Sequence, residues 1–272
     1  MKSATASEVV EILHRRYPPE SAQEWDRVGV VLGDLNQPVT KIFFAVDVLP
    51  VTVSEAIEWG ADFFIAHHPL FLFELAEPEP GVEPQPIAPW KVRVADDLKA
   101  SGITLVTAHT NADIALPGVS DALADALGLV NVMPMPEGLG RVGDVVRPVP
   151  LSKFVEQIAR SIPVGANGVR ATGDPHQLIK RVALCGGSGD DRFEIVQELG
   201  VDAYLTADLK HHRVAEALAA GAPVLIDGGH FATEWPWLAQ AARLLATDLE
   251  EGGYARPEMK ISEISTDPWR VR

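Results

Sequence analysis

The chain has 272 residues, a formal net charge of −15 and 47% apolar residues. This length suffices for one large or two small domains, and the composition is typical of soluble globular proteins. The acidic balance argues against a general nucleic-acid-binding surface, and the lone Cys185 excludes an internal disulfide. The N-terminus predicts an amphipathic helix rather than a signal sequence, and no apolar run approaches membrane length. We therefore expect a cytoplasmic protein.

In the first half of the chain, apolar strand-like runs alternate with helical patterns. The periodicity predicts helices over 7–17, 53–59 and 90–100, and strands over 41–48, 61–68 and 103–108. This alternation is typical of a mostly parallel sheet with helices on its faces. Residues 74–89, rich in Glu and Pro, are predicted to form an irregular acidic loop, either a solvated connection or a lid.

The pattern restarts at Val142, after a stretch rich in Met, Pro and Gly over 131–140 that marks a candidate domain boundary. The second half predicts further strands over 142–149, 168–172, 182–185, 203–206, 224–226 and 260–264. It predicts helices over 151–162, 193–199, 214–220 and 237–249. Cys185 ends an apolar strand before two glycines, which favours a buried structural thiol over a nucleophile.

One internal echo links the two halves. Gly60 and Asp62 precede the strand that ends at His68, and Gly200 and Asp202 precede the strand over 203–206. Both pairs follow a predicted amphipathic helix of similar length. The repeat suggests two related α/β halves.

Two adjacent histidines, His67 and His68, close a buried apolar strand and are followed by Pro69. Proline cannot donate to a sheet ladder, so the strand is expected to end there, and the carboxyl edge of a parallel sheet is where function commonly lies. Two neutral imidazoles at a strand end form a good half-site for a divalent transition metal. The alternative is a histidine pair satisfied by backbone or water.

Two more predicted strand ends carry similar side chains. The strand over 103–108 is followed by His109 and Asp113, although Asp113 could instead cap the next helix. The strand over 224–226 is followed by a glycine pair and then His230 and Glu234, and Glu234 could instead complement a helix dipole. Because each of these two strand ends is followed by both a histidine and a carboxylate, the pattern favours a shared site over coincidence.

These segments supply a set of five candidate ligands. Five protein ligands exceed one tetrahedral site and suit two metal ions with a bridging carboxylate and water. Mixed N/O donors suit Zn, Fe, Mn, Co or Ni. The predicted ligands are His67, His68, Asp113, His230 and Glu234.

The motifs around these residues resemble those of the Nif-three-like family, whose members are often labelled GTP cyclohydrolase I type 2 homologues. The matching motifs run in the same order over nearly the whole chain: His67-His68-Pro69, His109-Thr110-Asn111-Ala112-Asp113 and Gly229-His230-xx-Thr233-Glu234. Secondary matches are Trp25-Asp26-xx-Gly29, Gly186-Gly187-Ser188-Gly189 and Thr206-Ala207-Asp208-Leu209-Lys210.

The resemblance implies a two-domain, three-layer α/β/α fold, a dinuclear metal site and a ring-like homohexamer. We expect residues 1–130 with 222–272 to form the metal-binding domain and residues 131–221 a second α/β domain. Carried over by motif position, the five ligands are those named above, with Glu234 as the bridge. His109 is implied to be a nearby polar group, holding a ligand or facing the substrate, rather than a direct ligand.

Two departures from the family pattern concern this chain's own motifs. Ala207 stands where the family's Thr-Gly-Asp motif has glycine, which leaves Asp208 available and suggests an altered turn. The acidic segment over 74–89 carries no family motif. The glycines at 186–189 are interpreted as a flexible turn that could hold a phosphate, a weak signal.

The leading functional hypothesis is a metal-dependent hydrolase, GTP cyclohydrolase-like or phosphoesterase-like, acting on a small nucleotide-like or phosphorylated substrate. His109 and Asp208 are the candidate catalytic residues, which would move protons at the edge of the site. The alternative is a non-catalytic metal-binding oligomer with an interaction, regulatory or metal-handling role. His211 and His212 are interpreted as a solvated helix end or an inter-subunit contact, because no carboxylate cluster accompanies them in the sequence.

Overall fold

The computed structural model describes residues 2–72 and 86–271 and divides into two compact units. The first comprises Met1–Ala112 with Leu238–Thr266, and the second comprises Asp113–Trp237 with Asp267–Arg272. Most of the segment over 74–89 lies outside the described residues. In the described part of the chain, no helix has the length and apolar character needed to cross a membrane.

The first unit is built on a mixed sheet with the strand order β1-β4-β3-β2-β11. The pairs within β4-β3-β2-β11 are parallel, and β1 is antiparallel to β4. The strands are β1 (Gly29–Leu32), β2 (Lys41–Ala45), β3 (Phe63–Ala66), β4 (Thr104–Thr107) and β11 (Glu258–Ile261). Ala66 lies opposite Thr107, so β3 and β4 end at the same edge of the sheet.

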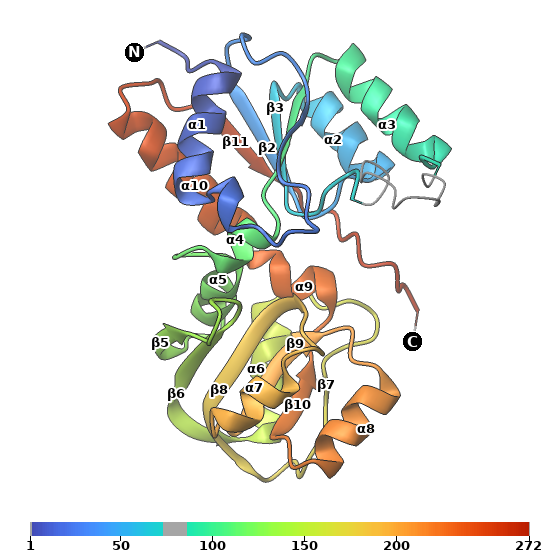
Figure 1. Ribbon diagram of the computed structural model, residues 1–272, viewed down its shortest axis with the longest axis vertical. Coiled ribbons are helices and arrows are strands. Elements are labelled where there is room, and N and C mark those ends of the chain that lie inside the picture. Colours follow the sequence, from blue (N-terminus) through green and yellow to red (C-terminus); the bar gives the residue numbers. More distant parts are fainter. Residues whose placement is uncertain (1, 73–85, 272) are drawn as a thin grey trace. The chain divides into compact units, whose positions relative to one another are not determined.

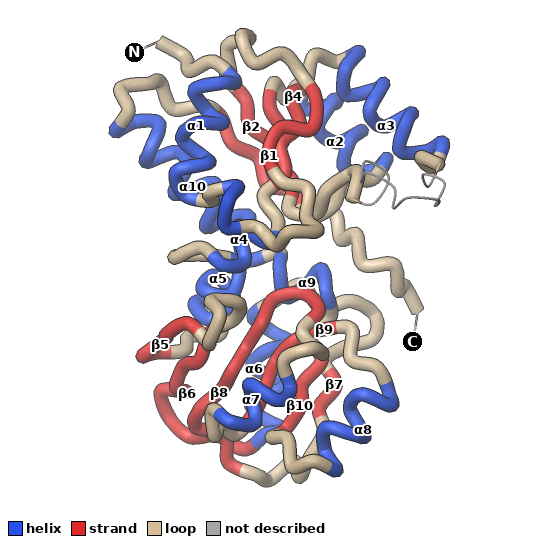
Figure 2. The backbone as a smooth tube through the Cα atoms, viewed as in Figure 1, coloured by secondary structure: helices blue, strands red, loops and turns tan. Residues whose placement is uncertain are grey.

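Helices cover both faces of this sheet, as Figures 1 and 2 show. On one face, α2 (Pro50–Trp59) and α3 (Pro89–Ala100) pack on Phe43, Phe64 and Leu105. On the other face lie α1 (Ala6–Arg16) and α10 (Pro236–Glu251). A capping box between Thr5 and Glu8 begins α1 by satisfying orphan N–H groups of its first turn. Short helices follow α1 (η1, Pro19–Ser21) and β4 (α4, Thr110–Ile114).

The second unit has a mixed sheet with the order β5-β6-β8-β9-β10-β7. The pairs β8-β9 and β9-β10 are parallel and the remaining pairs are antiparallel. Its strands are β5 (Val130–Pro134), β6 (Arg141–Pro150), β7 (Arg170–Ala171), β8 (Leu178–Ser188), β9 (Ala203–Ala207) and β10 (Val224–Asp227). Alternate strand residues feed two cores, because successive side chains point to opposite faces. Val182 and Leu205 enter one core, and Ala183 and Tyr204 enter the other.

The helices of the second unit also form two layers (Figure 1). The first core receives α5 (Val119–Ala126), α6 (Leu151–Ser161) and α9 (His230–Glu234). The second receives α7 (Phe193–Glu198) and α8 (His211–Ala219). The predicted α/β fold of two three-layer halves is thus confirmed. We predicted mostly parallel sheets, whereas most strand pairs of the second sheet are antiparallel.

The division between the units differs from the expected domain bounds. The sequence placed 222–272 with the first domain, whereas β10 pairs in parallel with β9 of the second sheet. Similarly, α5 packs against β8 instead of the first sheet. The chain crosses between units near Asp113, within α10 and again after Thr266. Arg141, fully buried, anchors the segment after the first crossing by donating to Asp121 and to the carbonyl of Ala115.

The aspartates of the repeated Gly-x-Asp pattern have the same structural role in both units. In the first unit, Asp62 Oδ2 accepts the backbone N–H groups of Thr40 and Lys41, at 2.6 and 2.9 Å. In the second, Asp202 Oδ2 accepts those of Lys180 and Arg181, at 2.7 and 2.9 Å. Each carboxylate therefore fixes the neighbouring strand at the point where its parallel pairing begins. The preceding glycines, Gly60 and Gly200, have φ values of 74° and 62°, which favour glycine at the helix end.

Candidate functional site

Three imidazoles meet at the edge of the first sheet where β3 and β4 end. His67 and His68 follow β3, and His109 follows β4 after one residue. Their candidate ligand nitrogens all lie within 4.8 Å of one another. The ring centroids are 5.1 to 5.5 Å apart. The parallel register of β3 and β4 explains this meeting, and we refer to these three residues as the histidine group.

Each ring of the histidine group is held through its Nδ1 atom. Nδ1 of His67 lies 2.9 Å from the carbonyl oxygen of Ala108, Nδ1 of His68 lies 2.8 Å from Asp47, and Nδ1 of His109 lies 2.8 Å from Asp26. A carbonyl or carboxylate oxygen only accepts, so each Nδ1 carries the proton and donates. In the neutral ring the lone pair then lies on Nε2, and neutral imidazole is the form that binds a metal.

Asp26 is the most buried of these acceptors, and the sequence analysis gave it no role in the site. Its side chain is 0% exposed and accepts from His109, from the backbone N–H and hydroxyl of Thr110, and from the N–H of Arg27. Burial opposes the charged form, but the hydrogen bonds from His109 and Thr110 outweigh it and lower the pKa of Asp26. The only sequence signal for Asp26 is its place in the Trp25-Asp26-xx-Gly29 motif.

Asp47, the partner of His68, is the second acceptor that sequence reasoning missed. It lies after β2 and also accepts from the hydroxyl of Thr266. Because β2 is the parallel neighbour of β3, its end meets the same sheet edge as His68. A third strand end therefore contributes to this group through a carboxylate that orients a ring.

The second unit holds a separate group at the ends of β9 and β10. His230 lies between two carboxylates: its Nδ1 is 2.7 Å from Asp208 Oδ2 and its Nε2 is 3.0 Å from Glu234 Oε1. The charge of Glu234 contributes most to raising the pKa of His230 to about 11, which burial opposes and the Asp208 hydrogen bond supports. The hydrogen bond from His230 in turn lowers the pKa of Asp208. We call these three residues the carboxylate–histidine group.

Local backbone geometry produces this group. His230 and Glu234 lie four residues apart in α9, so they project from the same side of the helix. Gly229 begins the turn with a φ of 85°. Asp208 itself adopts a φ of 57°, a conformation that aspartate tolerates better than most residues. Ala207, at the position of the family's glycine, is a buried β9 residue, and the left-handed turn falls on the next position.

Gly186 and Gly187 pack against this group as strand residues, where the sequence predicted a flexible turn over 186–189. Gly186 and Gly187 lie inside β8. Gly187 has a φ of 66°, and a Cβ at that position would meet both Glu234 Oε1 and His230 Nε2. Its N–H donates to the hydroxyl of Thr233, 3.0 Å away. The motif therefore gives α9 a close approach to β8, and Cys185 before it is buried as predicted.

The remaining predicted residues lie outside these two groups. Asp113 is a half-buried residue of α4 at the start of the second unit, and it stays a predicted ligand. His211 and His212 begin α8 and are both exposed, with ring centroids 5.3 Å apart. The structure thus contains His and Glu side chains that could hold a metal ion. It brings His67, His68 and His109 together in one unit, and Asp208, His230 and Glu234 together in the other.

The fold and these groups define a two-unit α/β protein with histidine and carboxylate donors of the kind that bind divalent metals. The family model of Duf34/NIF3 (NGG1p interacting factor 3) matches residues 4–268. The chain belongs to this family, which confirms the resemblance seen in the motifs.

Several relatives are similar over their full length. A Streptomyces coelicolor protein named "GTP cyclohydrolase 1 type 2 homolog" is 42% identical, with 97% of this chain and 93% of the relative covered. A Mycobacterium tuberculosis protein of the same name is 30% identical, covering 99% and 97%. Among solved structures, a hypothetical protein of Staphylococcus aureus matches with a TM-score of 0.87 at 25% identity, covering all of both chains. A Bacillus cereus protein related to NIF3 has a TM-score of 0.87 at 22% identity, covering 99% of each chain, which supports the fold.

Proposed function

We propose that this protein binds two divalent metal ions per chain and hydrolyses a small nucleotide-like or phosphorylated molecule. The observation that carries the proposal is the histidine group, in which each ring donates from Nδ1 to a fixed acceptor and the candidate ligand nitrogens lie within 4.8 Å of one another. In metal proteins, a hydrogen-bond acceptor at the ring nitrogen that does not bind the metal orients the histidine ligand in this way. The names of the relatives, "GTP cyclohydrolase 1 type 2 homolog", support a hydrolytic reaction.

The proposed ligands are His67, His68, Asp113, His230 and Glu234, with Zn, Fe, Mn, Co or Ni as the metal class. The donor chemistry fits, since imidazole nitrogen and carboxylate oxygen together suit these ions. Glu234 is the proposed bridging ligand, and its side chain is only 4% exposed. A bound metal of this kind lowers the pKa of its water and so supplies a nucleophile near neutral pH.

His109 is the proposed proton acceptor of the reaction. His109 belongs to the histidine group, and its Nδ1–H donates to the carboxylate of Asp26. A proton taken up at Nε2 therefore gives a cation beside this buried carboxylate. Asp208 holds His230 in the corresponding way and, being 54% exposed, can exchange protons with water.

The proposal also covers location and assembly. A cytoplasmic homohexamer that takes a small-molecule substrate follows from the family resemblance and the acidic charge. Light scattering coupled to size-exclusion chromatography tests the assembly. A mass near six chains supports it, and a monomer at micromolar concentration contradicts it.

The test of function is a screen of metal-reconstituted protein against nucleotides, phosphoesters and cyclic amides. We expect turnover that disappears on chelation and falls by about a hundredfold or more in His109→Gln, with metal content unchanged. Turnover that survives chelation contradicts the hydrolytic role of the metal. Full metal loading without turnover of any substrate favours the alternative, a non-catalytic interaction or metal-handling protein, for which the family description "NGG1p interacting factor" is the supporting observation.

A further inference from the structure

A cavity in the second unit has no proposed metal ligand among its lining residues. It occupies about 400 Å³ between α8, the end of β10 and the short edge strand β7. Its apolar wall is formed by Val214, Ala215 and Leu218 of α8, with Leu225 of β10 and Leu209 behind them. This size and this mostly apolar lining with a few polar groups are typical of small-molecule sites.

The part of this wall that α8 forms is not covered by the protein. None of the nine residues of α8, all of them described, is buried. Leu218 is 41% exposed. Val214 is partly buried and packs against the second core. Leu218 lies one helical turn later and is exposed to solvent where it lines the cavity. An apolar body in the cavity would cover Leu218 and gain the free energy of that burial.

The polar end of the cavity suits an anion. Both oxygens of Asp227 already accept hydrogen bonds: Oδ1 from the N–H of Gly229, and Oδ2 from Arg170 at 2.6 Å and the N–H of Leu209. Both carboxylate oxygens of Asp227 therefore already bind groups of the protein itself. The guanidinium of Arg170 has five N–H donors, and within the described residues one of them makes a hydrogen bond. Its side chain is 64% exposed, so its other donors face solvent at the mouth of the cavity.

The cavity also adjoins the carboxylate–histidine group through the backbone. Leu209 follows Asp208, and Gly229 precedes His230. The carboxylate of Asp227 holds the N–H groups of both Leu209 and Gly229. A molecule bound beside Arg170 therefore contacts the ion pair that fixes the two turns carrying Asp208 and His230.

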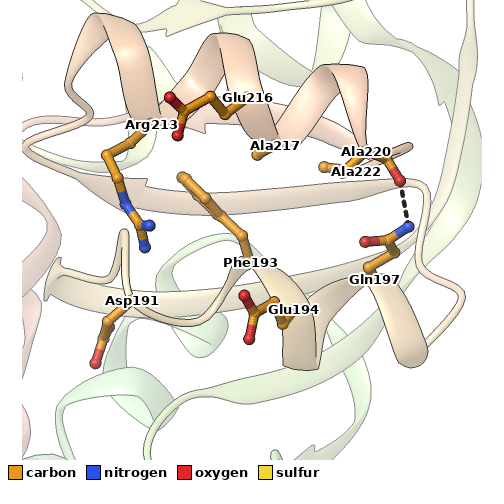
Figure 3. A pocket seen from close by; sticks show the side chains of 9 residues that line it. All are labelled: Asp191, Phe193, Glu194, Gln197, Arg213, Glu216, Ala217, Ala220 and Ala222. Atoms are coloured by element: carbon orange, nitrogen blue, oxygen red, sulfur yellow. Dashed lines mark hydrogen bonds between the residues drawn. The ribbon is translucent and has the colours of Figure 1, made fainter.

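The opposite side of α8 provides a contrast. There a smaller cavity of about 190 Å³ lies between α7 and α8, lined by Phe193 and Ala220 among others. Figure 3 shows Arg213 reaching toward Phe193, and its guanidinium carbon lies 5.8 Å from the ring centroid. Glu194 and Glu216 flank this cavity. Its lining thus includes a cation of the protein itself together with acidic side chains.

We propose that the larger cavity binds a small organic anion with an aromatic or branched apolar body, whose carboxylate or phosphate binds Arg170. His211, which also lines the cavity, supplies a further polar contact. The site does not depend on the metals and is not part of the proposed catalytic machinery. Its position beside the turns that carry Asp208 and His230 makes it a regulatory site next to the carboxylate–histidine group.

Calorimetric titration of the full chain, metal-free and metal-loaded, with phenyl phosphate and with benzoate tests this proposal. Inorganic phosphate and benzyl alcohol test each half of the ligand alone. We expect at least one of the two aromatic anions to bind, and each half to bind more weakly. Arg170→Gln should weaken binding by about tenfold or more, the usual effect of losing a charged hydrogen bond. Ala215→Phe should abolish binding by filling the cavity.

Ala220→Phe is the matched control, because Ala220 is an exposed alanine at the end of α8 that lines the other cavity. We expect it to leave binding unchanged. If Ala215→Phe does not fold, Arg170→Gln and Leu218→Gln decide the question. Equal binding to wild type and these variants, or no binding of either anion at millimolar concentration, overturns the proposal. A change of oligomeric mass in Leu218→Gln without anion binding also overturns it and identifies a protein interface instead. Binding in the metal-free protein separates this result from the proposed hydrolytic function.

Discussion

The Nδ1–H of His109 donates to the carboxylate of Asp26 over 2.8 Å, although 83 positions separate the two residues in the sequence. The same carboxylate holds the backbone and hydroxyl of Thr110. One buried acid therefore fixes both the ring orientation at the end of β4 and the start of α4. This links the stability of the first unit to the geometry of the histidine group.

Replacing this acid should cost stability. Asp26→Ala removes the acceptor of four hydrogen bonds and leaves buried donors of His109 and Thr110 unsatisfied. We expect the free energy of unfolding to fall by about 2–4 kcal/mol in a denaturant titration. Asp34→Ala is the control, because Asp34 is exposed and, among the described residues, its carboxylate accepts hydrogen bonds from the neighbouring Asn36. A loss for Asp26→Ala no larger than that of the control would contradict this role.

The position of Gly187 predicts a second effect. Gly187→Ala adds a Cβ that meets Glu234 and His230, and also places alanine at a φ of 66°. Gly60→Ala has the same backbone problem at a φ of 74° but open space around the new Cβ. We expect Gly60→Ala to cost about 1 kcal/mol and Gly187→Ala at least about twice that. Only Gly187→Ala should also lower metal content, and equal metal loss in both variants would argue against the packing role.

Cys185 should be inert in the folded protein. Burial is the main cause that raises the pKa of its thiol to about 12, and the nearby carboxylate of Asp113 adds to it. Because the thiolate is the reactive form, modification by a disulfide reagent should be roughly a thousandfold slower in the folded protein than in denaturant. Rapid stoichiometric labelling of the folded chain would show that the thiol is accessible.

The capping box of α1 predicts a pH dependence. The backbone N–H of Thr5 and the Lys2 ammonium lower the pKa of Glu8 to about 2, below the usual value of 4.5. A lowered pKa in the folded state means that the ionised group stabilises the fold above about pH 4.5. This contribution is lost as the pH falls from there through about 2. Wild type should therefore be more stable than Glu8→Gln at pH 7, and the difference in melting temperature should shrink below pH 4.5. A difference independent of pH would contradict the assignment.

Much of the fold follows from local sequence. The paired Gly60–Asp62 and Gly200–Asp202 signals mark a left-handed helix end and a carboxylate that holds the neighbouring strand, and both are short-range features. The strand ends carrying His67, His109 and His230 also follow from apolar runs that stop at polar residues.

Other features depend on contacts that a local pattern does not encode. Asp26 and Asp47 reach their histidines only through the order of the strands, so nothing in their own neighbourhood marks them as partners. The unit boundary depends on β10 pairing with β9, whereas sequence order alone groups β10 with the C-terminal segment. Gly186 and Gly187 continue β8 where α9 packs closely on them, although glycine usually indicates a turn.

The central claim is that residues of these two groups bind metal, and metal content per chain tests it most directly. Untagged protein, reconstituted and desalted, is analysed by elemental mass spectrometry alongside His68→Ala, Glu234→Ala and the control His212→Ala, which removes an exposed histidine of α8. We predict about two metal ions per chain in wild type and in the control, as expected for a dinuclear site, and a clear loss in the other two variants. Unchanged metal content in both His68→Ala and Glu234→Ala would contradict the account.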